Sequence, residues 1–351
     1  MVGWAMDLPK RGATSNPRNR FERLEVELDE EFAQEARNPD TQFLRDDAQT
    51  LISYTESPDI GFGASINPYR GCEHGCAYCY ARPYHEYLGY SAGIDFETRI
   101  MVKNAAPEIL RRELTSPKWR PQPLAMSGVT DCYQPVERKL RITRRCLEVL
   151  AEFRNPVAIV TKNHLVTRDI DILSRLATVD AAVVNVSITT LNAELSRRME
   201  PRASLPHHRL DAIRRLSSAG IPVRVLVAPV IPGLNDHEIP SILSAARGSG
   251  TQGAGYVLLR LPYAVKDIFS EWLARHLPGS RARILERIRA TRGGLLNDAR
   301  FATRMCGEGS EAETIRRLFE VSVAREGLNT ESMALSTAAF RKPAGQQLEL
   351  L

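Results

Sequence analysis

The chain has 351 residues, of which 43% are hydrophobic and 25% are charged, and its formal net charge is +5. These values are typical of a globular protein and fall short of a strongly basic nucleic-acid-binding domain, although they permit an anionic partner. No apolar run approaches the roughly 20 residues of a membrane-spanning helix, and the N-terminus lacks the pattern of a signal peptide. The sequence therefore predicts a cytoplasmic protein, where clustered cysteines are metal ligands or redox groups more often than disulfides.

The N-terminal segment, residues 1–60, is polar, and we expect an irregular extension with one short helix near the acidic stretch 25–32. From residue 61 onward, short apolar runs alternate with amphipathic runs of helical period. The expected strands are 65–69, 123–128, 157–161, 181–189, 223–229 and 255–261. The expected helices are 137–153, 167–179, 205–220 and 236–248, followed by 265–277, 281–292 and 311–327 near the C-terminus.

The expected strands are short and continuously apolar, which is typical of a parallel sheet buried on both faces. About six strand–helix units occupy the middle of the chain, whereas a complete eight-unit barrel needs about 250 residues. The predicted fold is therefore α/β, with a partial (β/α)6 TIM-type barrel over residues 61–265. Residues 266–351 are predicted to form a helical extension, and the last dozen residues a tail.

Three cysteines, Cys72, Cys76 and Cys79, lie within the stretch NPYRGCEHGCAYCYAR at C-x3-C-x2-C spacing. Glycines at 71 and 75 allow this loop to curl so that three thiolates converge on one centre. One interpretation is a zinc-binding interaction module without catalytic activity, with His74 or His85 as the fourth ligand. The other is a [4Fe–4S] cluster whose fourth iron has no protein ligand and is open to a cofactor or substrate.

The cysteine spacing after a first strand, with an aromatic residue, Tyr78, before the third cysteine, resembles the radical S-adenosylmethionine (SAM) superfamily. The resemblance implies a partial barrel in which SAM binds the open iron of a [4Fe–4S] cluster. It also implies that an electron from a donor such as flavodoxin or ferredoxin cleaves SAM. The resulting 5′-deoxyadenosyl radical would then abstract a hydrogen atom from a substrate that the sequence does not name.

Polar residues at the carboxyl ends of the expected strands are candidates for binding SAM, because the site of such a barrel forms there. Lys162 would pair with the SAM carboxylate, although a lone lysine also fits a solvated loop. Ser187 would bind the ribose or carboxylate, or only satisfy backbone groups at a strand end. The full set of cofactor candidates is Tyr78, Ser127, Gly128, Lys162, Ser187, Thr189 and Arg202.

Within the superfamily, the chain resembles spore photoproduct lyase and its uncharacterised bacterial relatives through CAYCYA, TD, TKN, SIT, MEPR and APVIPG. This resemblance implies a nucleic-acid repair or modification enzyme as an alternative function. Gly128 stands where those enzymes carry a hydrogen-donating cysteine. Cys132 is a candidate replacement or else a small buried hydrophobe. Cys306 is a second candidate, whereas Cys146 belongs to the apolar face of a helix.

Two basic stretches, residues 199–215 and 280–292, contain several arginines and histidines. Arginine binds phosphate with two hydrogen bonds, so either stretch is a candidate surface for nucleic acid. The alternative is a solvated helix face.

Overall fold

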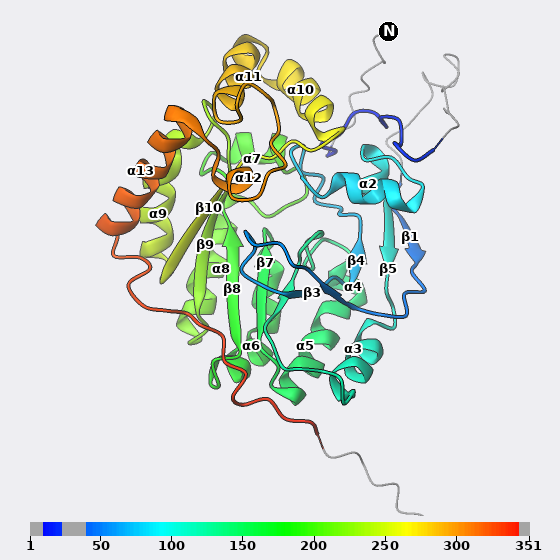
Figure 1. Ribbon diagram of the computed structural model, residues 1–351. Coiled ribbons are helices and arrows are strands. Elements are labelled where there is room, and N and C mark those ends of the chain that lie inside the picture. The colour runs from blue at the N-terminus through cyan, green and yellow to red at the C-terminus, as the bar shows by residue number, and fades with distance from the viewer. Residues whose placement is uncertain (1–9, 23–39, 344–351) are drawn as a thin grey trace, which may run out of the picture.

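The structure is a computed structural model that describes residues 10–22 and 40–343. Its main sheet has seven strands in the order β10-β9-β8-β7-β6-β3-β2, and every neighbouring pair is parallel except the antiparallel pair of β2 and β3 (Figure 1). The fold is therefore mixed α/β with a parallel sheet. The strands are β2 (Ile52–Tyr54), β3 (Ala64–Ile66), β6 (Leu124–Met126), β7 (Val157–Thr161), β8 (Ala182–Ser187), β9 (Val223–Val230) and β10 (Gly253–Leu258).

A second sheet has three strands, and one of them, β4 (Tyr69–Arg70), follows strand β3 of the main sheet after two residues. In it, β5 (Arg99–Val102) pairs in parallel with β1 (Gln42–Arg45) and antiparallel with β4. The expected strand at 65–69 is thus divided between two sheets at Asn67-Pro68, where proline removes a backbone donor. This division turns the chain just before the first cysteine.

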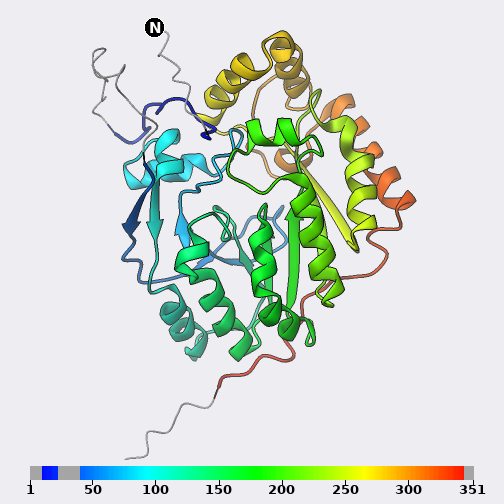
Figure 2. The same cartoon turned by 180° about the vertical axis from the view of Figure 1, so that it is seen from behind.

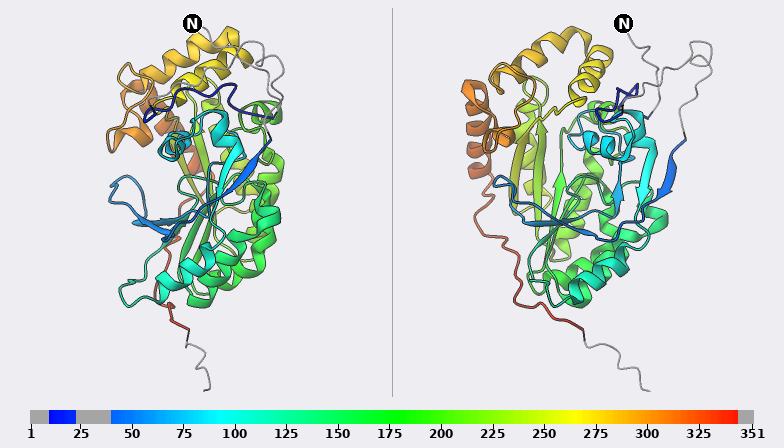
Figure 3. Two further views of the ribbon diagram at one scale, coloured as in Figure 1. Left: turned by 90° about the vertical axis from the view of Figure 1, so that its right-hand side faces the viewer. Right: turned by 45° about the vertical axis from the view of Figure 1, so that its right-hand side comes forward.

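Helices cover one face of the main sheet, as the view from behind and the side view show (Figures 2 and 3). Each follows a parallel strand and runs back toward the start of the next strand, as in other parallel α/β folds. These helices are α3 (Ala106–Thr115), α4 (Glu137–Leu140), α5 (Ile142–Phe153), α6 (Ile170–Ala177), α8 (Pro206–Ser218) and α9 (Ile239–Gly248). The connections also contain α2 (Ile94–Thr98), α7 (Ala193–Met199) and the 3-10 turns η1 (Arg82–Leu88), η2 (His164–Asp169) and η3 (Asp236–Glu238).

The C-terminal part of the chain returns to the carboxyl end of the sheet. Helices α10 and α11 lie above this end, near α7 and α12, and α13 lies beside α9 (Figure 1). Their bounds are α10 (Val265–His276), η4 (Pro278–Ser280), α11 (Arg281–Ala290), α12 (Thr303–Cys306) and α13 (Gly309–Arg325).

Two hydrophobic cores organise the molecule. The larger core fills the space between the main sheet and its helices. The smaller core joins Cys76 and Tyr78 to apolar residues of α10 and α11, including Trp272, whose indole N–H donates to the carbonyl of Arg198 at 2.9 Å. The C-terminal helices therefore pack directly against the cysteine loop.

Six parallel strands agree with the predicted number of units, and the arrangement is consistent with a partial barrel. Strands β2 and β10 stand at the two edges of the sheet, so the described strands do not close a barrel. Side chains connect these edges instead, because Arg304 of α12 binds Asp59 of the β2–β3 loop at 2.5 Å. The helix expected near residues 25–32 and most of the expected tail lie outside the described residues.

No helix in the described parts of the chain combines the length and the apolar character needed to cross a membrane.

Candidate functional site

The cysteine loop, residues 71–82, begins at the carboxyl side of the first parallel strand. Gly71 and Gly75 have φ angles of 78° and 64°, in the left-handed region that glycine adopts without steric cost. The N–H of Cys72 donates to the carbonyl of Phe96 at 2.8 Å, and the N–H of Cys79 donates to that of Cys76 at 3.2 Å. The loop therefore has the curled course expected from its glycines.

The three thiols of the loop are free, and burial, helped by Cys79 and Cys72, raises the pKa of Cys76. Cys79 packs against two hydrophobic clusters. One is the smaller core, which contains Cys76, and the other is a separate small cluster that contains Cys72. Burial and the nearby Cys72 raise the pKa of Cys79 to about 11, whereas Arg82 and Lys162 oppose this shift. Three converging soft donors on one loop, with cationic groups nearby, fit a cluster held through three thiolates.

The two histidines considered as zinc ligands contact other groups, although His74 also interacts with the Cys72 thiol. The His74 ring lies 3.3 Å from the Asp131 carboxylate and 3.1 Å from the Asn163 amide. The ring of His85 packs against Tyr90 and Phe96. Within residues 10–22 and 40–343, no group of three or more His, Cys, Asp or Glu side chains is arranged to hold a single metal ion. The three loop cysteines are among these side chains, so the zinc site with His74 or His85 as fourth ligand stays a prediction.

A buried ion pair supports the cysteine loop from behind. The Arg82 guanidinium donates to the carbonyl of Cys76 at 2.9 and 3.0 Å and to the Glu97 carboxylate at 2.5 Å. Glu97 also accepts the N–H of Gly12 at 3.1 Å. A side chain at Gly12 would meet the carbonyl oxygen of Gly75 at 1.7 Å, so the N-terminal segment lies directly on the loop. Residues far apart in the sequence therefore fix the position of the cysteines.

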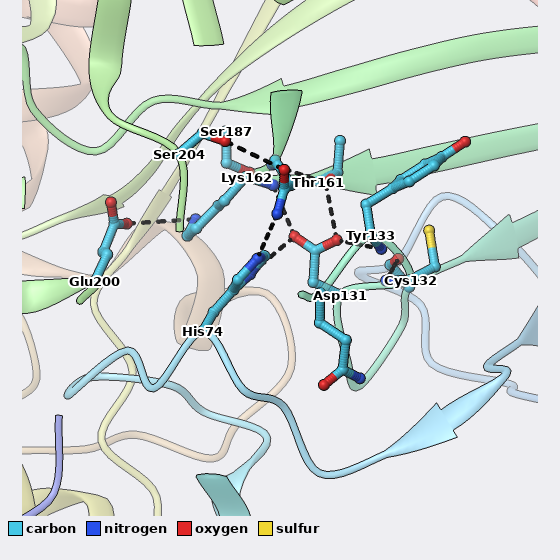
Figure 4. Close-up of polar contacts among 12 residues, drawn as sticks. His74, Asp131, Cys132, Tyr133, Thr161, Lys162, Ser187, Glu200 and Ser204 are labelled. Atoms are coloured by element: carbon cyan, nitrogen blue, oxygen red, sulfur yellow. Dashed lines mark hydrogen bonds and ion pairs between the residues drawn. The ribbon is translucent and has the colours of Figure 1, made fainter. Parts of the chain in front are cut away.

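Three of the SAM-binding candidates meet at one carboxylate, that of Glu200, and Figure 4 shows the contact of Lys162 with it. The Tyr78 hydroxyl donates to Glu200 Oε1, the Thr189 hydroxyl lies 2.7 Å from the same oxygen, and Lys162 Nζ lies 3.9 Å away. Lys162 Nζ also donates to the carbonyl of Ala228 at 3.1 Å. The carboxyl ends of β7, β8 and β9 and the cysteine loop are thus linked through one cluster, which we call the Glu200 cluster.

Arg209 of α8 supplies the main counter-charge to Glu200. Its guanidinium donates to Glu200 Oε2 and, at 3.0 Å, to the carbonyl of Ser187. Burial opposes the ionisation of Glu200, but Arg209 and then Lys162 outweigh burial and lower the pKa of Glu200 to about 2. Glu200 is therefore ionised, and every strong polar group around it has a partner.

Asp131 connects β6 to β7. Its carboxylate accepts the Thr161 hydroxyl at 2.8 Å, the N–H of Lys162 at 2.7 Å and the N–H of Tyr133 at 2.9 Å (Figure 4). Burial raises its pKa, and the adjacent His74 more than offsets this, so the pKa is below the ordinary value. Asp131 thus fixes the backbone from which Lys162 projects.

Ser127 and Gly128 form the turn after β6. Ser127 has a φ of 87°, and its hydroxyl accepts the N–H of Cys132 at 2.9 Å. The carbonyl of Gly128 accepts the Tyr80 hydroxyl at 2.6 Å. A side chain at Gly128 would only reach ordinary contact distance from Ser65 and Asn67. The glycine therefore leaves space beside the residue that follows the third cysteine.

The cysteines outside the loop lie in two kinds of surroundings. Cys132 and Cys146 are fully buried in the larger core. The Cys132 thiol has no accessible surface, which agrees with the alternative of a small buried hydrophobe, and its role as a hydrogen donor stays a prediction. Cys306 is exposed at the end of α12, and its thiol lies 3.0 Å from the carbonyl of Ala302. Its predicted role stays a prediction.

Arg202 and the other arginines of the first basic stretch are paired with carboxylates. Arg202 donates to Glu73 at 2.7 Å, between the first two cysteines. Arg214 and Arg215 pair with Asp211. In the second stretch, Arg287 pairs with Asp236 and Glu311. Together with the Arg209–Glu200 pair, these contacts neutralise the arginines of the first stretch, whereas within the second stretch, all of which the structure describes, the ion pairs involve Arg287 alone.

A cavity of about 550 Å³ lies on the outside of the molecule among η3, α11 and α13. Its lining contains none of the predicted site residues: Gly233, Leu234, Asp236, His237, Leu277, Ser280, Arg283, Ile284, Arg287 and Leu318.

Comparison with known sequences identifies the class of the protein. A sequence profile of the Radical SAM superfamily matches residues 66–246, so the chain belongs to this superfamily. An uncharacterised protein of Mycobacterium tuberculosis is 35% identical over 229 residues, which cover 65% of this chain and 67% of that protein. The Radical SAM Nalpha-GlyT isomerase of Pseudomonas phage M6 is 25% identical over 172 residues, or 49% of this chain and 34% of the isomerase.

Solved structures show the same fold. A spore photoproduct lyase mutant superposes with a TM-score of 0.59 at 16% identity, over 82% of this chain and 80% of that chain. A second mutant, with bound SAM and dinucleoside spore photoproduct, gives 0.59 at 14% identity and the same coverage. The protein is therefore a radical SAM enzyme, and its family uses a [4Fe–4S] cluster and SAM.

Sequence reasoning missed two residues that organise the candidate site. Glu200 and Arg209 are both fully buried and ion-paired. Glu200 lies in the MEPR stretch, which was noted only as a shared motif. A carboxylate inside such a stretch, just after a strand–helix unit, was the available signal, but nothing in the spacing identified Arg209 as its partner.

Proposed function

We propose that the protein binds a [4Fe–4S] cluster through Cys72, Cys76 and Cys79 and uses it to cleave SAM reductively. Hydrogen abstraction from a substrate would follow. The observation that carries the proposal is the convergence of the three cysteines beside the Glu200 cluster at the carboxyl edge of a parallel sheet. In such folds the active site lies at this edge.

The residues of the Glu200 cluster have distinct proposed roles. Lys162 keeps its ammonium partly free, because its distance to Glu200 is 3.9 Å, and it pairs with the SAM carboxylate. Tyr78 and Thr189 are oriented by Glu200 and line the adenosyl side. Ser187 contributes its strand-end backbone, and the turn at Ser127 and Gly128 faces the amino group.

The bound cluster and SAM together would supply a 5′-deoxyadenosyl radical when a reductant delivers one electron. The chain's part is to orient SAM, to hold charge at fixed atoms and to limit access of water, which restricts side reactions. Buried, fully paired polar groups such as Glu200 and Arg209 do not need to reorganise while this happens. A reductant such as flavodoxin or ferredoxin is the proposed electron donor.

Anaerobic reconstitution with iron and sulfide tests this proposal. We expect about four irons per chain, an electron paramagnetic resonance signal after reduction, and 5′-deoxyadenosine and methionine formed from SAM. Replacement of any loop cysteine by alanine should abolish the signal. The matched control is Cys306→Ser, because this thiol is exposed and far along the sequence from the loop, and it should retain its iron. A cluster that never forms in the wild-type protein would reject the proposal.

A second candidate function is a nucleic-acid repair or modification enzyme. The observation in its favour is the fold shared with spore photoproduct lyase, one structure of which contains a dinucleoside photoproduct. Pairing of the arginines of the first basic stretch weakens this candidate. Salt-dependent binding of DNA distinguishes the two, since phosphate contacts make affinity fall steeply with salt. No binding at low salt would leave only the fold in common.

We also propose the division of the chain into an N-terminal extension (1–60), a radical SAM domain (61–265) and a C-terminal extension (266–351). Contacts of Gly12 and of α10 with the cysteine loop support a role for both extensions in holding that loop. A cytoplasmic location is likewise part of the proposal.

A further inference from the structure

Arg260 lies at the carboxyl edge of the sheet, two residues after the end of β10. Its guanidinium lies over the ring of Tyr80 at 5.1 Å from the centroid, and one terminal nitrogen lies 3.8 Å from the sulfur of Met305. Arg260 is partly exposed and Tyr80 is 41% exposed, so both are accessible from solvent. We call Arg260 and Tyr80, with Met305, the Arg260 site.

The charge of Arg260 is not balanced by a partner. Among the described residues, none of its nitrogens forms an ion pair, and its buried Nε has no hydrogen-bond acceptor. Asp59, whose charge acts on Arg260 from a distance, is paired with Arg304 at 2.5 and 2.7 Å. Burial lowers the pKa of Arg260, and Arg304 adds to this. An unbalanced cation of this kind costs free energy until an anion joins it.

The Arg260 site is held rigidly. The buried Arg292 donates to the carbonyls of Leu258 and Leu259 at 3.3 and 2.7 Å, just before Arg260. The same side chain donates to the carbonyls of Thr303 and Arg304 at 2.9 and 3.0 Å. Arg292 thus fixes the end of β10 against α12. A charge that is costly yet preorganised is typical of a binding group.

The Arg260 site adjoins the proposed centre of the reaction. Tyr80 follows Cys79 directly in the loop, and its hydroxyl donates to the carbonyl of Gly128 at 2.6 Å. One side chain therefore connects the loop with residues after β6 and after β10, although β6 and β10 are four places apart in the sheet. A group bound by Arg260 would lie next to the cysteine loop, beyond the edge strand β10, which neighbours strand β9 of the Glu200 cluster.

We propose that Arg260 binds an oxyanion of the substrate, a phosphate or a carboxylate, and so positions the substrate beside the cysteine loop. The inference rests on the proposed function, because it names the substrate class of the same site. A planar guanidinium presents two parallel donors to such a group, which gives direction as well as attraction. The substrate class is therefore an anion-bearing molecule.

The test measures anion binding by the cluster-containing protein with SAM present in excess, so that the cofactor's own carboxylate occupies its site. The probes are tripolyphosphate and citrate at low millimolar concentration, with sodium chloride at matched ionic strength as the reference. We expect at least one probe to raise the Tm by about 2 °C at ten times its dissociation constant. Phosphate and carboxylate sources are distinguished by which probe acts.

Two variants and a matched control complete the test. Arg260→Gln should lose the Tm increase, and Arg260→Lys should bind the probe about tenfold more weakly because it lacks the paired donors. The control is Arg316→Gln on α13, whose arginine pairs with Glu313 and Glu320 on its own helix. It removes the same charge and should keep the full increase.

The outcomes separate this inference from the proposed function. A wild-type protein that binds a probe through Arg260 but forms no 5′-deoxyadenosine would retain the anion site and reject the proposed chemistry. A protein that forms 5′-deoxyadenosine while neither probe raises its Tm would overturn the anion site alone. An equal increase in Arg260→Gln and the wild-type protein would also overturn it.

Discussion

Two charged groups at the same edge of the sheet differ in how they are balanced. Glu200 is fully buried, and Arg209, Lys162, Tyr78 and Thr189 surround its carboxylate. Arg260 is only partly buried, and it contacts an aromatic ring and a thioether instead of a carboxylate. Within the described residues, the charge of Glu200 is thus balanced by counter-charges, whereas the charge of Arg260 has no counter-ion.

This difference indicates that the Glu200 cluster and Arg260 have different roles at the site. A complete cluster keeps its geometry whether or not a ligand is present, which suits a cofactor that every turnover uses. An incomplete charge changes its free energy when a ligand arrives, which suits selection of a substrate. Mutation of Glu200 and mutation of Arg260 should therefore change the free energy of unfolding differently, and measuring both variants tests this difference.

The largest expected effect is on stability, from Glu200→Gln. The change removes the charge that balances two buried or partly buried cations, and breaking a buried pair in this way costs about 3 kcal/mol. Urea unfolding of the apoprotein measures the loss. The matched control, Glu194→Gln on α7, breaks an exposed pair with Arg198 and should cost less than about 0.5 kcal/mol.

The Glu200 cluster also predicts a dependence on pH. The pKa of Glu200 is lowered to about 2 from an ordinary value of 4.5, so its contribution to stability is complete above pH 4.5. That contribution is lost as the pH falls toward 2, because the unfolded chain binds the proton first. The unfolding free energy of Glu200→Gln should therefore change less than that of the wild-type protein in this range. Parallel curves would show that Glu200 is not the responsible group.

The second effect is on cofactor binding, from Lys162→Met. Its ammonium contacts a carbonyl and lies 3.9 Å from Glu200, so one direction is left for the SAM carboxylate. We expect SAM affinity to fall at least about tenfold, or about 1.4 kcal/mol, with little change in unfolding. Equilibrium dialysis of the cluster-containing protein measures the affinity. Lys118→Met, an exposed lysine before β6, should bind SAM normally.

The six parallel strands and most helices could be predicted because their signals are local, whereas β2 was missed, since it has three residues and lies in the segment expected to be irregular. Strand β7 coincides with the expected 157–161, and α8 lies within 205–220. The small sheet was missed, because β1, β4 and β5 are 2–4 residues long and pair over distances that no local pattern encodes.

The candidate site shows the same limit. Cys72, Cys76 and Cys79 could be selected from spacing alone, and Lys162 from its place after a strand. The Arg209–Glu200 pair and the contact of Gly12 with the loop depend on how the chain folds back on itself. Cys132 was a plausible thiol in sequence and is core in the structure, because the turn after β6 directs it inward. The local sequence was enough to identify the candidate ligands, whereas the residues that hold them in place could be identified only from the tertiary structure.

A smaller effect is expected from Tyr80→Phe. The variant keeps the ring under Arg260 and loses one hydrogen bond to the carbonyl of Gly128, which is worth about 1 kcal/mol. Urea unfolding should show this loss, and the anion-dependent increase in Tm should persist because the cation still lies over a ring. Loss of the increase would mean that the Tyr80 hydroxyl itself binds the anion. Tyr54→Phe, an exposed tyrosine of β2, is the control for the change in ring chemistry.

The smallest effect on stability is expected from Arg260→Gln, and it is the sharpest contrast with Glu200→Gln. Removal of a partly buried charge that has no counter-ion relieves a desolvation cost, so the free energy of unfolding should stay within about 0.5 kcal/mol of the wild-type value or rise slightly. Urea unfolding without added anions measures it. A loss near 3 kcal/mol would contradict the comparison, because it would mean that Arg260 holds the fold together as Glu200 does. An unchanged or higher stability would instead fit a residue whose free energy is improved by a ligand and not by its neighbours.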